Sequence, residues 1–576
     1  MIIESRTKIS IENDFKVEAG PGAGKTEFLI NHIINVIQNS KRLTSSRKIA
    51  CITYTNTGVE TIVKRLDKNC VEKVEVSTIH SFLYKHIVKP YSAFLTEEYG
   101  VKSTLINGHD EFEVKHSIVN EWLKLEAFDK LQVPNNRKQF KIPKQYVSLS
   151  NWLLSMQCKL VDGTVTFECN NQKAEGIKKS NLKILSEQLI NLKKYYWAQG
   201  KIDHNDVLYF SVILINTFPF ILDVLRAKFP YIFLDEYQDT SPVQDYIIKK
   251  LKEKETKIGV IGDRAQSIFS FQGADISLFN HFKVDFDEEY SIIENHRSSG
   301  EIVDFLNSIR KDIEQVKCKP NSGNKVLIIV GDKMEAYKNA VNLCGTKNGS
   351  KLVSLSRDNI SSNAMKSKFN IIHLDRNICL KYDETESNSI RKKYISIAMQ
   401  AVELSQNGKY KEAIKRIEKL FVKEKEVKKK AVFFLINLLE KYNQYSDGTL
   451  MDFYNVVSSL HIVELSSFRN GKVKTFYEQT KYREMALTIN IIDDTSNHIT
   501  IHKAKGNQFE NVMVIGTKKI KEVLLTPNLE EDEEHRVAYV AFSRAKNRLF
   551  IQFDELSIEE EKKIKKEINS IDVKRI

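Results

Sequence analysis

The chain of 576 residues is 41% hydrophobic and 28% charged, with a formal net charge of +13 and a pI of about 9.0. Its length exceeds what one hydrophobic core organises and predicts roughly three or four domains. The positive charge favours nucleic acid over a membrane as partner, although excess lysine also serves solubility alone. No apolar run approaches the ~18 residues that span a bilayer, and residues 1–6 lack a signal-peptide pattern, so we expect a cytoplasmic protein.

The seven cysteines form no Cys-x-x-Cys pair. The usual ligand spacing of a zinc or iron–sulfur centre is therefore absent. We expect reduced, mostly buried thiols.

A strand-like segment, residues 15–18, leads into a glycine-rich loop, and an apolar stripe of helical spacing follows over residues 28–37. The loop residues are Ala19, Gly20, Pro21, Gly22, Ala23, Gly24, Lys25 and Thr26. Their spacing is that of a phosphate-binding loop, in which backbone N–H groups face phosphates at a helix N-terminus. Lys25 would reach the β- and γ-phosphates and the Thr26 hydroxyl would bind Mg²⁺, so the pattern predicts a nucleoside triphosphatase.

Apolar strand-like runs alternate with helical patterns in two separated regions, which predicts an α/β fold with parallel sheets. The first region comprises residues 16–83 and 229–286, and the second comprises residues 292–355 and 499–553. Each region is interrupted by a segment that predicts mainly helix, over about residues 90–200 and 372–490. The second segment includes long lysine- and glutamate-rich helices such as residues 410–442.

Two adjacent carboxylates, Asp235 and Glu236, follow the apolar segment 232–234. Parallel sheets hold their ligands at the carboxyl ends of the strands. Asp235 would complete the Mg²⁺ shell begun by Thr26, and Glu236 would be the general base for the attacking water. Alone, the acidic pair is weak evidence for a triphosphatase. Together with Lys25 of the phosphate-binding loop, it is strong evidence.

A further strand and polar loop occupy residues 259–274, where Gln266 is placed to sense a phosphate and aromatic residues follow. With this segment the chain resembles the UvrD/Rep family of superfamily one DNA helicases, because seven motifs occur in family order. The motifs are residues 53–56, 78–81, 235–236, 262–274, 295–298, 500–506 and 539–545.

The resemblance covers the two α/β regions, about half of the chain. It implies two RecA-like P-loop NTPase domains, each interrupted by a mainly helical insertion, with ATP between the domains and single-stranded DNA across the top. The first domain is expected at 1–89 and 201–290, with a 1B-like insertion at 90–200. The second domain is expected at 291–371 and 491–576, with a short 2B-like insertion at 372–490 and a C-terminal helix at its end.

The resemblance also implies catalytic roles for two arginines of the second domain. Arg297 and Arg544 would reach the γ-phosphate only when the cleft closes, and would stabilise the charge that develops during phosphoryl transfer. Gln266 would report the γ-phosphate to the DNA-facing loop.

On the DNA side, the resemblance implies contacts by six residues, Tyr54, Thr55, Asn56, His80, Phe271 and His502. Phe271 stands where the family commonly stacks a tryptophan on a base, a contact that tolerates any sequence. The alternative is that Phe271 and Phe269 are core residues and that the two histidines are structural.

Several family positions differ here. Residues 1–18 contain no adenine-reading glutamine, His296 replaces a base-stacking tyrosine, and Gln508 replaces a ribose-contacting glutamate. An imidazole still stacks on a base, so we expect ATP binding with weaker selectivity. Gln272 replaces an arginine, which removes one phosphate contact.

These observations predict an ATP- and Mg²⁺-dependent 3′-to-5′ translocase and helicase acting on single-stranded DNA and on duplexes with a 3′ overhang, the polarity being implied by the resemblance alone. The short second insertion and the absence of a carboxylate-plus-lysine nuclease pattern resemble helicase subunits of anti-phage systems such as Gabija, whose partner is an OLD-type nuclease. General DNA repair is the other pathway. The alternative activity is a DNA-end-sensing ATPase that regulates a partner nuclease without productive unwinding.

Overall fold

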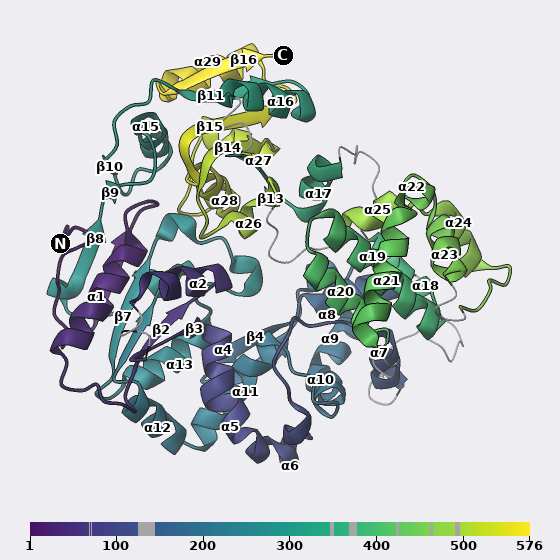
Figure 1. The fold of residues 1–576 in the computed structure, drawn as a ribbon. Coiled ribbons are helices and arrows are strands. Elements are labelled where there is room, and N and C mark those ends of the chain that lie inside the picture. The colour runs from purple at the N-terminus through teal and green to yellow at the C-terminus, as the bar shows by residue number, and fades with distance from the viewer. Residues whose placement is uncertain are drawn as a thin grey trace.

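The computed structural model describes residues 1–67, 70, 72–124, 144–345, 351–367, 377–421, 426–460, 465–489 and 496–576. Its described residues contain two six-stranded parallel sheets, which lie in the lower left and the upper part of Figure 1. In spatial order the first sheet contains β3 (Val74–Thr78), β2 (Ile49–Thr53), β6 (Tyr231–Leu234), β7 (Lys257–Gly262), β1 (Phe15–Ala19) and β8 (Glu289–Ile292). Its central strands β2 and β6 are buried on both faces, as parallel strands covered by helices are.

The second sheet repeats this architecture. In spatial order it contains β13 (His498–Thr500), β12 (Leu352–Ser356), β14 (Phe509–Ile515), β15 (Ala545–Phe553), β11 (Val326–Val330) and β16 (Ile571–Arg575). Two parallel α/β sheets confirm the predicted fold class. The predicted C-terminal helix is present as α29 (Ile558–Glu567), but the last element is strand β16, which pairs with β11 and buries Ile571.

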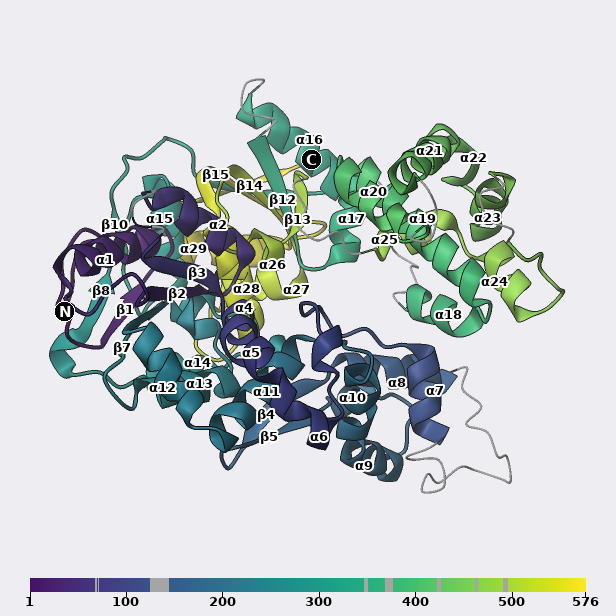
Figure 2. The same cartoon turned by 60° about the horizontal axis from the view of Figure 1, so that its bottom comes forward.

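Helices cover both sheets (Figure 2). Around the first sheet lie α1 (Lys25–Asn39), α2 (Asn56–Arg65), α4 (Ile79–Leu83), α11 (His204–Thr217), α12 (Phe220–Lys228), α13 (Pro242–Lys252) and α14 (Ile276–Asn280). Around the second lie α15 (Gly300–Ile309), α16 (Lys333–Cys344), α17 (Asn359–Ser367), α26 (Ile501–Ala504), α27 (Lys518–Leu525), α28 (Glu533–Phe542) and α29. Among the described residues no single helix is long and apolar enough to cross a membrane, and α11 with α12 reaches that length and hydropathy only as a pair bent by 107°.

The first insertion shares its core with the first sheet. Its helices are α5 (Lys89–Tyr91), α6 (Thr96–Tyr99), α7 (His116–Trp122), α8 (Lys144–Leu154), α9 (Lys179–Glu187) and α10 (Leu189–Trp197). Trp122, Trp152 and Trp197 are fully buried in one hydrophobic cluster that also contains Ile52 of β2 and Leu234 of β6. This continuous core fixes the insertion against the sheet.

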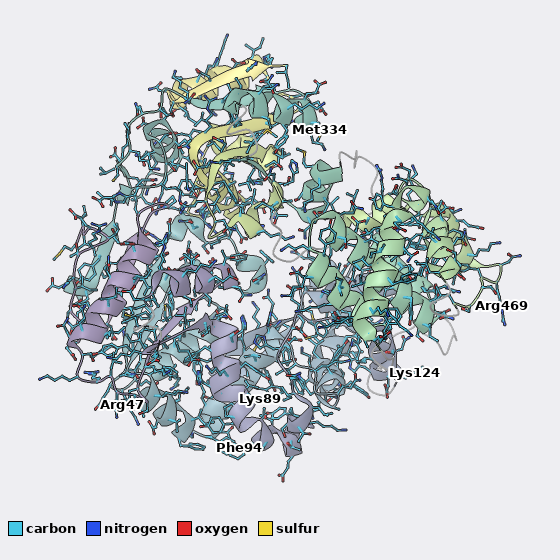
Figure 3. The ribbon with its side chains drawn as sticks, viewed as in Figure 1. Arg47, Lys89, Phe94, Lys124, Met334 and Arg469 are labelled. Carbon is cyan, nitrogen blue, oxygen red and sulfur yellow. The ribbon has the colours of Figure 1, made fainter. Side chains whose placement is uncertain are left out.

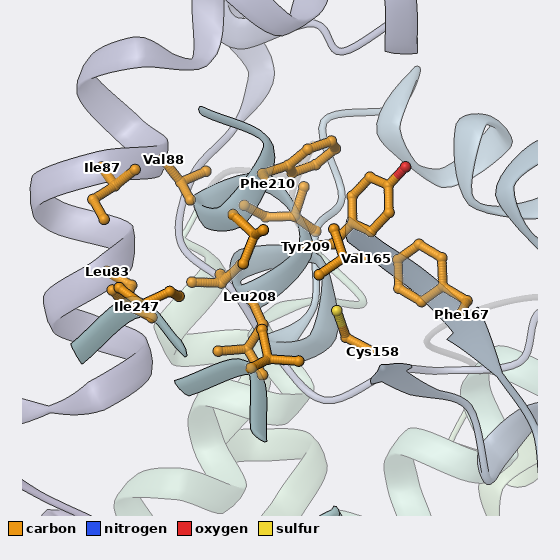
Figure 4. Packing of buried hydrophobic residues seen from close by; sticks show 14 of the residues in the cluster. Leu83, Ile87, Val88, Cys158, Val165, Phe167, Leu208, Tyr209, Phe210 and Ile247 are labelled. Atoms are coloured by element: carbon orange, nitrogen blue, oxygen red, sulfur yellow. The ribbon is translucent and has the colours of Figure 1, made fainter. Parts of the chain in front are cut away.

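The first insertion also contains an antiparallel hairpin that the helical prediction missed, β4 (Gln157–Val161) and β5 (Thr164–Glu168). Figure 4 shows Cys158, Val165 and Phe167 of this hairpin packed beside Tyr209 and Phe210 of α11. Its turn has positive φ at Asp162 (49°) and Gly163 (76°), and an Asp-Gly pair between alternating residues was the signal for it.

The second insertion has a hydrophobic core of its own. Its helices are α18 (Ile378–Thr385), α19 (Ser389–Gln406), α20 (Tyr410–Glu418), α21 (Val427–Glu440), α22 (Tyr442–Tyr445), α23 (Leu450–Ser459), α24 (Lys472–Gln479) and α25 (Tyr482–Leu487). Residues 410–442 thus form separate helices: α20 ends at Glu418, a turn follows at Lys419 and Leu420, and Phe421 is buried. Figure 3 places Arg469 at the outer tip of this insertion, far from Met334 in α16, which packs against the second sheet. The predicted divisions at 371/372 and 490/491 lie outside the described residues.

The seven cysteines are free, as predicted, but most are not buried. Cys51 and Cys158 are buried, whereas Cys318 is exposed and the remaining four are half-buried. Cys318 lies just after the short strand β10 (Val316–Lys317), which pairs with β9 (Glu294–Asn295).

Candidate active site

The glycine-rich loop joins β1 to α1 at the carboxyl edge of the first sheet. Gly22 (φ 75°) and Gly24 (φ 85°) adopt left-handed conformations, and a Cβ at Gly22 would lie 2.6 Å from Asn295 Oδ1. Lys25 Nζ donates to Ala19 O at 2.9 Å and lies 4.0 Å from Asp263 Oδ2. The loop residues 19–26 therefore form a cradle of backbone amides at a helix N-terminus, with an ammonium group in it, which fits a polyphosphate.

The acidic pair follows β6 at the same edge of the sheet. Glu236 has φ 58°, a strained conformation for a residue with a side chain, and such strain is concentrated at functional sites. Its N–H donates to Asp235 Oδ1 at 3.1 Å, and its Oε2 accepts from Gln238 Nε2 at 2.6 Å. Gln238 thus fixes the orientation of the Glu236 carboxylate.

The two carboxyl groups are electrostatically different. Burial and the neighbouring Glu236 raise the pKa of Asp235 to about 7. Burial also opposes charge on Glu236, but Lys25 and Lys505 outweigh it and lower its pKa. Glu236 is therefore suited to be a charged base. The buried Asp235 carboxylate gains most from a nearby divalent cation. Together with the Thr26 hydroxyl at the start of α1, it offers the oxygen donors that Mg²⁺ prefers.

Arg544 connects the second sheet to the first. It is buried after α28, and its Nη2 donates to Gln266 Oε1 at 2.7 Å. Gln266 Nε2 in turn donates to Asp263 Oδ2 at 2.5 Å. Burial lowers the pKa of Arg544 to about 10. The predicted sensor glutamine and one predicted arginine are thus in direct contact.

Arg297 lies against the phosphate loop, where its Cβ is 2.7 Å from the position of a Cβ at Gly22. Its Nη1 donates to Ser543 O at 2.7 Å, but its buried Nε–H has no partner. Burial and the nearby Arg544 lower its pKa to about 9. An unpartnered buried N–H next to an anion cradle fits the phosphate of a bound nucleotide.

Two predicted nucleotide contacts are less enclosed. The backbone N–H of His296 donates to Gly22 O at 3.0 Å, which places the residue beside the loop. The His296 side chain is 51% exposed. Gln508 is exposed in the turn before β14.

Two residues without an assigned role in the sequence join this site. Arg310 follows α15, is fully buried, and donates from Nη1 to Asp263 Oδ1 at 2.7 Å. Lys505 donates from Nζ to Gln266 O at 2.6 Å and forms an ion pair with Asp239. Lys505 lies within the motif at residues 500–506, whereas Arg310 stands next to Lys311 and Asp312 in a run that is typical of a solvated turn.

On the opposite side, the aromatic residues separate into buried and exposed rings. Phe269 is buried and stacks on Tyr54, with ring centroids 4.8 Å apart. Phe271 is 57% exposed, and its ring meets His502 edge-on at 5.3 Å. Phe271 is therefore free to stack on a base, whereas Phe269 is a core residue. The Tyr54 hydroxyl donates to Gln272 Oε1 at 2.5 Å.

The other predicted DNA contacts lie at helix starts. The Thr55 hydroxyl accepts from Gly58 N at 3.1 Å and so caps α2, and Asn56 is exposed in the first turn. The His80 ring stacks on His204 at 4.9 Å, and burial with the charge of His204 lowers its pKa to about 3. Burial lowers the pKa of His502 to about 4, and its Nε2 has no partner. Both histidines are therefore neutral near pH 7.

Two family models match the chain. Residues 4–287 match the UvrD/REP helicase N-terminal domain and residues 369–555 match the UvrD-like helicase C-terminal domain. Among similar proteins, a probable DNA helicase II homolog of Mycoplasma genitalium is 25% identical, over 93% of this chain and 82% of its own length. The ATP-dependent DNA helicases PcrA of Staphylococcus epidermidis and Staphylococcus aureus are 23% and 22% identical, over 95% of this chain and 82% of their own. Together with the phosphate loop, the acidic pair, the half-buried Arg297 and the buried Arg544, these matches show that the chain belongs to the UvrD/Rep helicase family.

Proposed function

We propose that this chain is an ATP- and Mg²⁺-dependent translocase and helicase that moves 3′-to-5′ on single-stranded DNA in the cytoplasm. The observation that carries the proposal is the contact between Arg544 of the second domain and Gln266 of the first. It joins a buried cation, which can reach a nucleotide only across the interface, to the segment that leads to the exposed Phe271. ATP binding at this interface and DNA binding beyond it are thereby mechanically linked.

Hydrolysis uses charges that the fold has already positioned. The Glu236 carboxylate, oriented by Gln238, accepts a proton from the attacking water. Arg297 and Arg544 stabilise the negative charge that grows on the transferred phosphoryl group, and Lys25 binds the phosphate chain. Thr26 and Asp235 would hold Mg²⁺, which neutralises phosphate charge when it is bound.

Loss of the γ-phosphate changes what Gln266 can contact. The Lys505 ammonium donates to the Gln266 backbone and lies 4.8 Å from the Phe269 ring, which in turn packs against Phe271 at 5.9 Å. A change at Gln266 is therefore transmitted through packed side chains to the base-stacking ring. This coupling converts hydrolysis into movement along the strand.

The direct test is strand separation by the purified chain on duplexes that differ only in whether the overhang is 3′ or 5′. Unwinding of the 3′-tailed duplex alone supports the proposal, and unwinding of the 5′-tailed duplex contradicts the polarity. DNA-stimulated hydrolysis without any unwinding favours the DNA-end-sensing ATPase instead. In that case co-purification with an OLD-type nuclease distinguishes a role in anti-phage defence from one in DNA repair.

A further inference from the structure

We propose that Glu294, His296 and Cys318 form a zinc-binding site beside the phosphate loop. One donor atom from each residue lies within 4.8 Å of the other two. His296 Nε2 is 2.9 Å from Glu294 Oε2 and 3.9 Å from Cys318 Sγ. The site therefore offers one oxygen, one nitrogen and one sulfur ligand around a single point.

The strand pairing places these three side chains together. Glu294 and His296 are two residues apart on an extended segment, so they project from the same face, while Asn295 between them is buried. β9 and β10 are parallel, and the Cys318 N–H donates to Asn295 O at 3.2 Å, which brings Cys318 alongside His296. The arrangement follows from the backbone and is not a chance meeting of long surface side chains.

The separations are close to those of a tetrahedral zinc site. Zinc–ligand bonds of roughly 2.0–2.3 Å imply an N···O separation of about 3.4 Å and an N···S separation of about 3.6 Å. The observed separations, 2.9 Å and 3.9 Å, differ from these by about half an ångström or less. Small side-chain rotations suffice, because His296 and Cys318 are both exposed.

The donor set selects the kind of metal. Thiolate and imidazole favour zinc over magnesium, which prefers oxygen ligands. Binding releases the Cys318 thiol proton to solvent, and the resulting thiolate with the Glu294 carboxylate balances the double charge of the ion. Water completes the fourth position on this exposed face. The glutamate and histidine alone would be an ordinary surface ion pair, so Cys318 is the residue that makes the site.

If the proposed function holds, zinc at this site should also affect ATP binding. His296 is bonded through its backbone to Gly22 of the phosphate loop. A zinc ion on Nε2 holds the imidazole against β10 and removes it as a stacking surface for a base. Micromolar zinc should therefore raise the KM for ATP severalfold in the wild type.

The test is metal binding by the full chain without ATP or DNA, so that its outcome is independent of helicase activity. Zn²⁺ is titrated in competition with a chromophoric chelator, and Co²⁺ is added to look for the absorption of a cobalt–thiolate bond. Cys318→Ser removes one ligand at an exposed position, and Cys344→Ser is the matched control. Circular dichroism confirms that each variant is folded.

We expect one tightly bound ion and a cobalt–thiolate band in the wild type and in Cys344→Ser. Cys318→Ser should lose the band. Its zinc affinity should fall at least 10-fold, because mutation of residues that only hydrogen-bond to metal ligands already costs roughly 10- to 100-fold in affinity. Equal zinc affinity of Cys318→Ser and the wild type overturns the proposal, as does a cobalt–thiolate band that survives in Cys318→Ser. A second variant, Glu294→Gln, should also weaken zinc binding while keeping the band.

Discussion

Arg544 Nη2 donates to Gln266 Oε1 at 2.7 Å across the interface of the two α/β domains. Both side chains are almost fully buried, so the contact is shielded from water. Burying the charged Arg544 guanidinium costs desolvation energy, and the same burial lowers its pKa. A bound polyphosphate would offset that cost, which supports our proposal that the pair belongs to the nucleotide site.

Arg544→Ala should lower the kcat of ATP hydrolysis by about 10³-fold, because arginines that stabilise phosphoryl transfer contribute 10³- to 10⁵-fold. The measurement is steady-state hydrolysis at saturating ATP and DNA. Arg548→Ala, at a half-buried position of β15 whose guanidinium bonds to Leu343 O and not to the site, is the control and should retain turnover. A kcat within about twofold of the wild type for Arg544→Ala would remove this residue from catalysis.

Arg310→Met should lower the free energy of unfolding by about 3–5 kcal/mol, since it removes the closest cation from the buried Asp263 charge. It should also lower kcat more than it changes KM, because Asp263 holds the Gln266 amide. Denaturant unfolding and steady-state kinetics test the two effects separately. Lys311→Met at the exposed neighbouring position should change neither quantity, and normal stability of Arg310→Met contradicts the role of the ion pair.

Glu236→Gln keeps the shape of the side chain but removes the base. We expect ATP to remain bound and unhydrolysed, with single-turnover cleavage slowed by about 10²- to 10⁴-fold, the usual contribution of a general base. Filter binding of labelled ATP and rapid quench measure the two steps. Turnover at the wild-type rate would exclude Glu236 as the base.

Phe271→Ala and Phe269→Ala separate recognition of DNA from packing. Phe271 is exposed, so its removal should change stability by no more than about 0.5 kcal/mol. It should nevertheless weaken single-stranded DNA binding by about 1–3 kcal/mol, the value of one stacked base. Phe269→Ala should instead destabilise the fold by about 3–5 kcal/mol. Fluorescence anisotropy with single-stranded DNA and thermal unfolding check both variants, and unchanged DNA affinity of Phe271→Ala would end its stacking role.

The parts of the site that the sequence predicts are those that depend on neighbours in the chain. The phosphate loop follows from a strand, glycines and a helix in succession, and the acidic pair from its position directly after β6. Arg310 could not be identified this way, because its partner Asp263 is brought to it only by the packing of one domain on the other. Cys318 meets His296 only because β9 pairs with β10.

Errors in the fold have the same origin. The hairpin β4–β5 lies in a region rich in helical spacing, and only its Asp162-Gly163 turn marks it. Helices α20 and α21 share a continuous charged pattern, yet α20 ends at Glu418 and the chain turns before the buried Phe421. Tertiary packing decided both outcomes against the local pattern.

The measurement that tests the central claim most directly is ATP hydrolysis by the purified chain with and without single-stranded DNA, at one stated low salt concentration because phosphate contacts weaken with salt. Lys25→Ala is the control and should bind DNA without hydrolysing ATP. Strong stimulation of the wild type by DNA is the result that the coupling through Gln266 and Phe271 predicts. Equal rates with and without DNA, in a chain that still binds DNA, would contradict it.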